Sequence, residues 1–129
     1  MAVRIVRLGD PRVAGEGPRL GTVRRLPRGV KKSDYAKRDY FDLWFPEVAP
    51  SDKLLSFATA QPWTPRRWQA FSKRYRSEIA KAPAKRTLAV LAALSRQADF
   101  SVGCYCEDER RCHRSVLREL LKEEGAQIR

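Results

Sequence analysis

The sequence predicts an α/β protein: a single-domain layered fold over residues 1–129, with a small, mainly parallel sheet flanked by helices. Three observations lead to this class. Apolar, strand-like segments alternate with amphipathic helical segments along the chain. A length of 129 residues is typical of one domain with a true hydrophobic core. The composition, 43% hydrophobic and 33% charged, is that of a globular rather than a disordered chain.

The N-terminal half is expected to contain short strands joined by loops. Apolar residues predict its strands, and glycine, proline and serine mark its turns and helix starts. The expected elements are a strand at 2–8, a loop at 9–20, a short strand at 22–26, a helical turn capped by Ser33, an extended aromatic segment at 40–45, and a short helix that begins at Ser51-Asp52 and carries Leu54.

The C-terminal half shows clearer helical patterns. Thr64 followed by Pro65 is a strong helix start, because the hydroxyl caps the helix and proline suits its first position. An apolar stripe then follows at helical spacing, which predicts a core face. The expected elements are this helix with Trp68, Phe71, Tyr75 and Ile79 inward, a break at 82–84, a helix to about Gln97 with Leu88, Leu91 and Leu94 inward, a strand at 100–106, and a last helix that Gly125 ends.

Positive charge dominates the chain. Lysine and arginine number 27 against 15 aspartate and glutamate residues, which gives a formal net charge of +12. Such a field favours polyanions such as nucleic acids or phosphorylated metabolites, although a solvated basic surface is the simpler alternative. The excess of lysine and arginine over acidic residues lies mainly in residues 4–38. We expect no membrane association, because no apolar run is long enough to span a bilayer, and the cytoplasm is the expected location.

The segment 104–115 gathers all three cysteines and the only histidine of the chain. It follows an expected strand and precedes an expected helix. Ligands of parallel sheets collect at the carboxyl ends of strands, and the start of a helix attracts anions. The sequence therefore predicts a ligand site at the turn 106–115.

Four interpretations of this cluster remain open. The first is an anion-binding helix start without covalent chemistry. The second is structural: Asp108 caps a helix that starts one turn earlier, and the cysteines are core residues. The third is a reactive thiol, either Cys112 with His113 as its base or a redox pair of Cys106 and Cys112. The fourth is a zinc site, whose candidate ligands are Cys104, Cys106, Cys112 and His113.

Further residues are expected to complete the site. The predicted ligand contacts, apart from the thiols, are Arg7, Arg25, Arg28, Glu107, Arg114 and Ser115. Glu107 would orient His113 or Arg114. Asp42 stands in an apolar run and needs a partner, for which Arg25 or Arg28 is the natural choice. Aromatic residues beside the lysines of 31–38 could stack on bases, whereas the simpler expectation places Trp44 and Phe45 in the core.

Four blocks of the sequence resemble the YeaO-like proteins, the domain of unknown function 488. They are Leu26-Pro-Arg-Gly-Val-Lys-Lys32, Tyr40-Phe-Asp-Leu-Trp-Phe-Pro-Glu-Val-Ala-Pro-Ser51, Trp68-x-x-Phe-x-x-x-Tyr-Arg-x-Glu78 and Cys112-His-Arg-Ser-Val-Leu117. The resemblance implies a compact, cytoplasmic α/β domain and no particular activity. This sequence departs from an Asp-Arg-Leu-Trp-Pro-Arg-Gly block of many relatives, because Val23 and Leu26 stand where that block has Asp and Trp.

The leading functional hypothesis is therefore recognition of a phosphorylated or nucleic-acid ligand at the turn 106–115. The alternative is a small thiol-dependent enzyme or redox-responsive protein, in which Cys112 and His113 would be catalytic. A second alternative is an interaction module without a small ligand. We expect no cofactor, and the zinc interpretation is not the favoured one.

Overall fold

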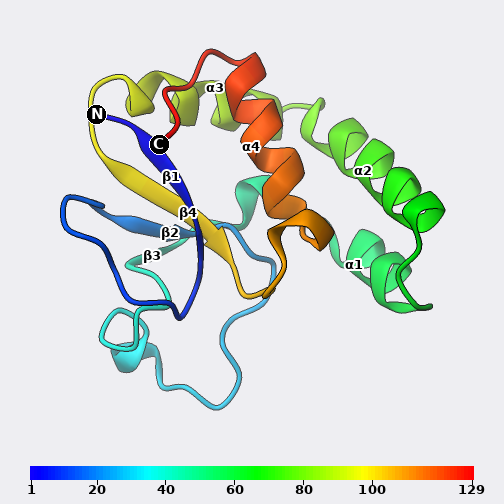
Figure 1. Ribbon diagram of the computed structural model, residues 1–129, viewed down its shortest axis with the longest axis horizontal. Helices are drawn as coiled ribbons and strands as arrows, with labels where there is room; N and C mark the ends of the chain where they lie inside the picture. Colours follow the sequence, from blue (N-terminus) through cyan, green and yellow to red (C-terminus); the bar gives the residue numbers. More distant parts are fainter.

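The structure, a computed structural model, describes residues 1–129 and consists of one sheet with helices beside it (Figure 1). The four strands lie in the order β1-β4-β2-β3, and every neighbouring pair is parallel. Their bounds are β1 Val3–Arg7, β2 Arg19–Gly21, β3 Leu43–Trp44 and β4 Phe100–Cys104. This architecture confirms the predicted α/β class.

Strand β4 is the centre of the sheet. It is buried along its whole length, and Val102 pairs with Ile5 of β1 on one side and Leu20 of β2 on the other. A parallel strand covered on both faces is expected to be a continuous apolar run, as 100–104 nearly is. Gly103 is required here because a Cβ would lie 2.6 Å from the Val6 carbonyl oxygen.

The strand boundaries differ from the prediction at several positions. Strand β2 begins inside the predicted loop 9–20, the predicted strand at 22–26 does not form, and β4 ends two residues earlier than expected, at Cys104. The three-residue strand β2 is too short to show alternation in sequence. It exists because it pairs with β4 and β3, which are distant along the chain.

The aromatic segment 40–45 forms only the two-residue edge strand β3. Trp44 is 46% exposed, and its indole N–H donates to the Val23 carbonyl at 2.8 Å. Phe45 packs against the main core, so the expectation of a core position holds for Phe45 and is wrong for Trp44. Asp42 pairs with Arg12 at 2.7 Å, not with Arg25 or Arg28.

The helices follow the predicted starts closely. Ser51 Oγ accepts from the Leu54 N–H and Thr64 Oγ1 accepts from the Arg67 N–H, as expected of their capping roles. Ser33 is not a cap, because Lys31 precedes the 3₁₀ turn Lys32–Asp34. The helices are α1 Asp52–Thr59, α2 Pro65–Ile79, α3 Ala84–Ser95 and α4 His113–Glu123, and two further 3₁₀ turns span Pro46–Val48 and Glu109–Arg111.

The main core lies between the sheet and the helices. Phe71, Tyr75 and Ile79 of α2 are buried, as the stripe predicts. The Tyr75 hydroxyl donates to the Val48 carbonyl at 2.5 Å, which satisfies a polar group inside the core. The prediction of an inward position is wrong for Leu94, which is 42% exposed and lies one turn after the exposed Val90 on the outer side of α3.

A second, smaller core cluster lies under the end of β4. It joins the strand end to the start of α4 and so determines where the predicted site is placed. Its buried members are Leu8, Val23, Phe41, Cys104 and Cys112.

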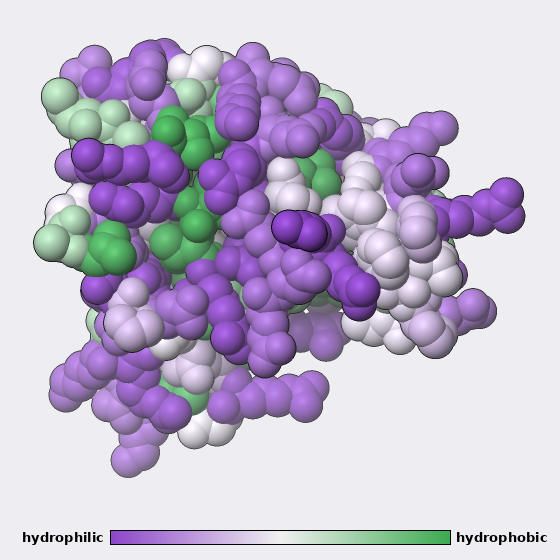
Figure 2. All heavy atoms as spheres, viewed as in Figure 1, coloured by the Kyte–Doolittle hydropathy of each residue, from purple (hydrophilic) through white to green (hydrophobic).

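The two chain ends lie side by side (Figure 1). The Val3 N–H donates to the Gln127 carbonyl at 2.9 Å, and the Arg129 N–H donates to the Val3 carbonyl at 3.0 Å. Figure 2 shows that hydrophilic residues cover most of the face in this view, with hydrophobic residues mainly over the sheet. None of the helices has the length and apolar character needed to cross a membrane.

Candidate functional site

A cavity of about 380 Å³ lies beside the connection between β4 and α4. Residues 104–106 and 111–113 of this connection line the cavity, which we call the thiol cavity. The rest of the lining comes from residues 23–25, Pro50, helix α1, Trp63 and Phe71. Most of the lining is apolar or aromatic, and the charged residues at its wall are Arg24, Arg25 and Arg111.

Cys112 is the N-cap of α4. Its backbone is extended (φ −129°, ψ 149°), and its sulfur accepts from the Arg114 N–H at 3.5 Å. Only 2% of Cys112 is exposed. Helix α4 therefore begins where the anion-binding interpretation expects it, while Cys112 is as buried as the structural interpretation expects. Asp108 caps the preceding 3₁₀ turn instead of α4, through the Arg110 N–H at 2.9 Å.

The three thiols converge on the wall of the thiol cavity. The sulfurs of Cys104 and Cys106 are 3.7 Å apart, and all three sulfurs lie within 4.8 Å of one another. Cys104 and Cys112 are buried, whereas Cys106 is exposed. The hydrogen bond with Cys104 lowers the pKa of Cys106, and the same contact raises the pKa of Cys104. Cys106 is thus the thiol of the cluster that loses its proton first.

His113 is held in one tautomer. Its Nε2 lies 2.9 Å from the Thr22 carbonyl oxygen, which can only accept, so Nε2 carries the proton. The lone pair on Nδ1 then faces the Cys112 sulfur at 3.9 Å. Burial lowers the pKa of His113 to about 4, although the bond to Thr22 acts in the opposite direction. The ring is therefore neutral near pH 7.

Arg114 belongs to a different face of the connection. Its guanidinium donates to the Cys106 carbonyl at 2.5 Å, and its buried Nε has no hydrogen-bond partner. It lines a separate cavity of about 480 Å³ together with Arg7 and Glu107. Glu107 is expected to orient His113 or Arg114, but its carboxylate lies 3.6 Å from Arg7 Nη2. The structure therefore brings Arg7, Glu107 and Arg114 together, apart from the thiols.

The other predicted contacts are placed as follows. Arg25 lines the thiol cavity, is exposed, and has Asp52 at 3.7 Å. Arg28 lines a neighbouring hollow of about 300 Å³, and Tyr105 lines both this hollow and the thiol cavity. Ser115 donates its hydroxyl to the Cys112 carbonyl at 3.0 Å and contributes to the first turn of α4.

One contact at the cavity wall was not predicted from the sequence. The Arg111 guanidinium stacks on the Trp63 ring, 4.4 Å from its centroid. Trp63 lies between α1 and α2, far from residues 104–115 along the chain. Its place just before the Thr64-Pro65 helix start does not indicate that it packs against the turn 106–115. No local sequence pattern could therefore have assigned Trp63 to the site.

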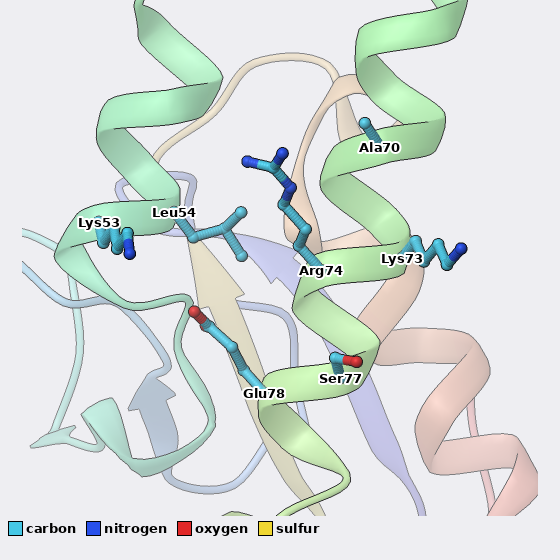
Figure 3. Close-up of a pocket in the computed structure, with 7 residues that line it drawn as sticks. All are labelled: Lys53, Leu54, Ala70, Lys73, Arg74, Ser77 and Glu78. Carbon is cyan, nitrogen blue, oxygen red and sulfur yellow. The ribbon is translucent and has the colours of Figure 1, made fainter.

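A larger hollow of about 840 Å³ lies between α1 and α2 (Figure 3). Arg74 reaches from α2 toward α1, and its guanidinium lies 4.0 Å from the centroid of the Phe57 ring. Glu78 at the other end accepts from the Ser51 N–H and hydroxyl. The hollow is lined by neither cysteine nor histidine, so it offers charged and hydroxyl groups but no soft metal ligand.

Residues 3–125 match the family model described as "Active DUF488-N3 subclade". The protein belongs to the DUF488 family. The match covers both the sheet and the thiol cavity, and it confirms the resemblance seen in the four sequence blocks. No curated protein and no solved structure matches this DUF488 protein.

Proposed function

We propose that this DUF488 protein binds a nucleotide-like phosphorylated ligand, free or as part of a nucleic acid, in the thiol cavity. The observation that carries the proposal is the pairing of an apolar, aromatic cavity with arginines at its wall. A volume of about 380 Å³ lies in the range of small-ligand pockets. An apolar wall with Trp63 and Phe71 suits a planar base, and arginine suits a phosphate.

Two of the three cavity arginines keep donors free for a ligand. Arg24 already donates to the carbonyls of Ala49 and Pro50, so its role is structural. Arg25 has only a distant partner, Asp52 at 3.7 Å, and Arg111 has Asp108 at 3.7 Å. These ion pairs are exposed and long, so each contributes little free energy. A phosphate that binds both arginines therefore breaks only weak interactions. Arg25 and Arg111 are therefore the proposed phosphate contacts.

The test is a binding titration of a nucleoside monophosphate and of the matching nucleoside at low salt. The nucleotide should bind more tightly, and its affinity should fall as salt is raised. Arg25→Ala and Arg111→Ala should each weaken nucleotide binding by about tenfold or more. Arg86→Ala removes the same charge from an exposed position on α3 outside the cavity, and should leave the affinity unchanged. Equal affinity for nucleotide and nucleoside would refute the proposal.

A second candidate, a thiol-dependent enzyme, is supported by the 3.9 Å contact between the Cys112 sulfur and Nδ1 of His113. The protonation states of Cys112 and His113 in the ligand-free protein argue against this candidate. The hydrogen bond with Cys104 lowers the pKa of Cys112, but the contact with Cys106 and burial together outweigh it and raise that pKa to about 11. Burial lowers the pKa of His113 to about 4. The proton therefore stays on Cys112, and ligand binding remains our leading proposal. Turnover of a bound ligand that Cys112→Ser abolishes would favour the enzyme.

A further inference from the structure

The sulfurs of all three cysteines lie within 4.8 Å of one another, although they come from three different local structures. Cys104 ends β4, Cys106 lies in the following turn, and Cys112 caps α4. None of them forms a disulfide. A disulfide would join two of the sulfurs and leave the third unpaired, whereas a single metal ion uses all three.

The distances suit a tetrahedral metal ion with sulfur ligands. Zinc–sulfur bonds of about 2.3 Å place two sulfurs of a tetrahedral site about 3.8 Å apart. The sulfurs of Cys104 and Cys106 are already 3.7 Å apart, and those of the whole set lie within 4.8 Å of one another. The side chains therefore need only a small contraction to reach coordination distance.

The surroundings favour the negative charge that three thiolates would bring. Cys112 stands at the start of α4, and its sulfur already accepts from the Arg114 N–H. Arg24, Arg25 and Arg111 line the same cavity as the three thiols. Three thiolates and a divalent ion carry one net negative charge, which these cations offset.

His113 offers the fourth ligand atom. Its Nε2–H donates to the Thr22 carbonyl, which is the second-sphere bond that orients most metal-bound histidines. Its Nδ1 lies 3.9 Å from the Cys112 sulfur, close to the nitrogen–sulfur separation of about 3.6 Å in a tetrahedral site.

We propose that Cys104, Cys106 and Cys112 bind one zinc-type divalent ion, with Nδ1 of His113 as the fourth ligand. Soft thiolates select zinc over magnesium or calcium, and a Cys₃His set is an established zinc donor set. The ion fixes the connection between β4 and α4 and releases the thiol protons on binding. This inference stands apart from the ligand proposal, because the ion can bind while the cavity holds no nucleotide.

The experiment uses the full chain, purified in reductant, freed of metal by a chelator, and titrated with Co²⁺ and then Zn²⁺. Co²⁺ should saturate at one ion per chain, with thiolate charge-transfer absorption and the intense visible bands of a tetrahedral ion, and Zn²⁺ should displace it. Cys106→Ser should weaken Co²⁺ binding by more than about tenfold and reduce the charge-transfer absorption. Cys106 is exposed, so this variant should fold.

Ser56→Ala is the control, because it removes a hydroxyl from an exposed position of α1 that does not line the thiol cavity, and its Co²⁺ spectrum should equal that of the parent. His113→Gln should keep the charge-transfer absorption and shift the visible bands, since only the nitrogen ligand changes. The absence of saturable Co²⁺ binding by the reduced parent, or binding that Cys106→Ser leaves unchanged, would overturn the inference. The nucleotide titration is run on the metal-free chain as well, so that failure of either proposal is seen separately.

Discussion

The carboxylate of Glu16 and the guanidinium of Arg19 form a two-point ion pair inside the protein, with N–O distances of 2.7 and 3.0 Å. Only 3% of Glu16 and 1% of Arg19 is exposed. The Ser101 hydroxyl donates to the same carboxylate at 2.7 Å. The pair therefore ties the loop before β2 to the central strand β4, which leads directly to the thiol cavity.

Removing one partner of this pair should destabilise the fold. Glu16→Gln leaves Arg19 buried without its counter-charge, and the expected loss is about 3–5 kcal/mol of unfolding free energy. Glu47→Gln makes the same chemical change at an exposed position and should alter the stability by no more than about 0.5 kcal/mol. Urea unfolding followed by circular dichroism measures both. Equal effects from the two variants would contradict the structural role of the pair.

The same carboxylate should make stability depend on acid pH. Burial alone would raise the pKa of Glu16, but hydrogen bonds from Arg19, Ser101 and the Val13 N–H lower it from 4.5 to about 2. A lowered folded-state pKa contributes stability that is complete above pH 4.5 and is lost as the pH falls toward 2. The stability difference between the parent and Glu16→Gln should therefore shrink over this interval. A difference that stays constant from pH 7 to pH 2 would be evidence against this origin.

Two glycines of one loop allow a steric effect to be separated from a conformational one. Gly15 and Gly17 have nearly equal positive φ angles, +76° and +77°. A Cβ at Gly15 meets nothing within 4 Å, whereas a Cβ at Gly17 would lie 2.0 Å from the Asp99 carbonyl oxygen. Gly15→Ala should cost about 1 kcal/mol, from backbone strain alone. Gly17→Ala should cost at least about 2 kcal/mol more, because the backbone must move. Thermal unfolding of both variants checks the order, and equal losses would contradict the close approach.

The residues that the sequence placed correctly are those with a strong local signal. Ser51 and Thr64 start helices as expected, and the stripe from Phe71 to Ile79 faces the core. Strand β2 could not be predicted in the same way, because its three residues owe their conformation to β3 and β4.

In the candidate site, too, local sequence signals predicted the segment but not its tertiary contacts. The turn 106–115 was found from its composition, but its contacts are split among separate cavities. Arg114 and Arg7 lie together in one, whereas Cys112 and His113 line another. Neighbours in sequence such as His113 and Arg114 face different cavities, since successive positions on a helix point in different directions. Trp63 joins the site only through the packing of distant segments.

The exposures of the three thiols predict an order of chemical modification. In the reduced, metal-free protein, iodoacetamide should modify Cys106 first, because Cys106 is exposed while Cys104 and Cys112 are only 7% and 2% exposed. Peptide mapping by mass spectrometry over time measures this order. The proposed ion should then protect all three thiols, since a coordinated thiolate is both less nucleophilic and less accessible. Protection should disappear when a chelator removes the metal. If Cys106 reacts equally fast with and without Zn²⁺, its sulfur does not bind the ion; if Cys112 reacts before Cys106, the connection between β4 and α4 opens far more readily than its buried contacts indicate.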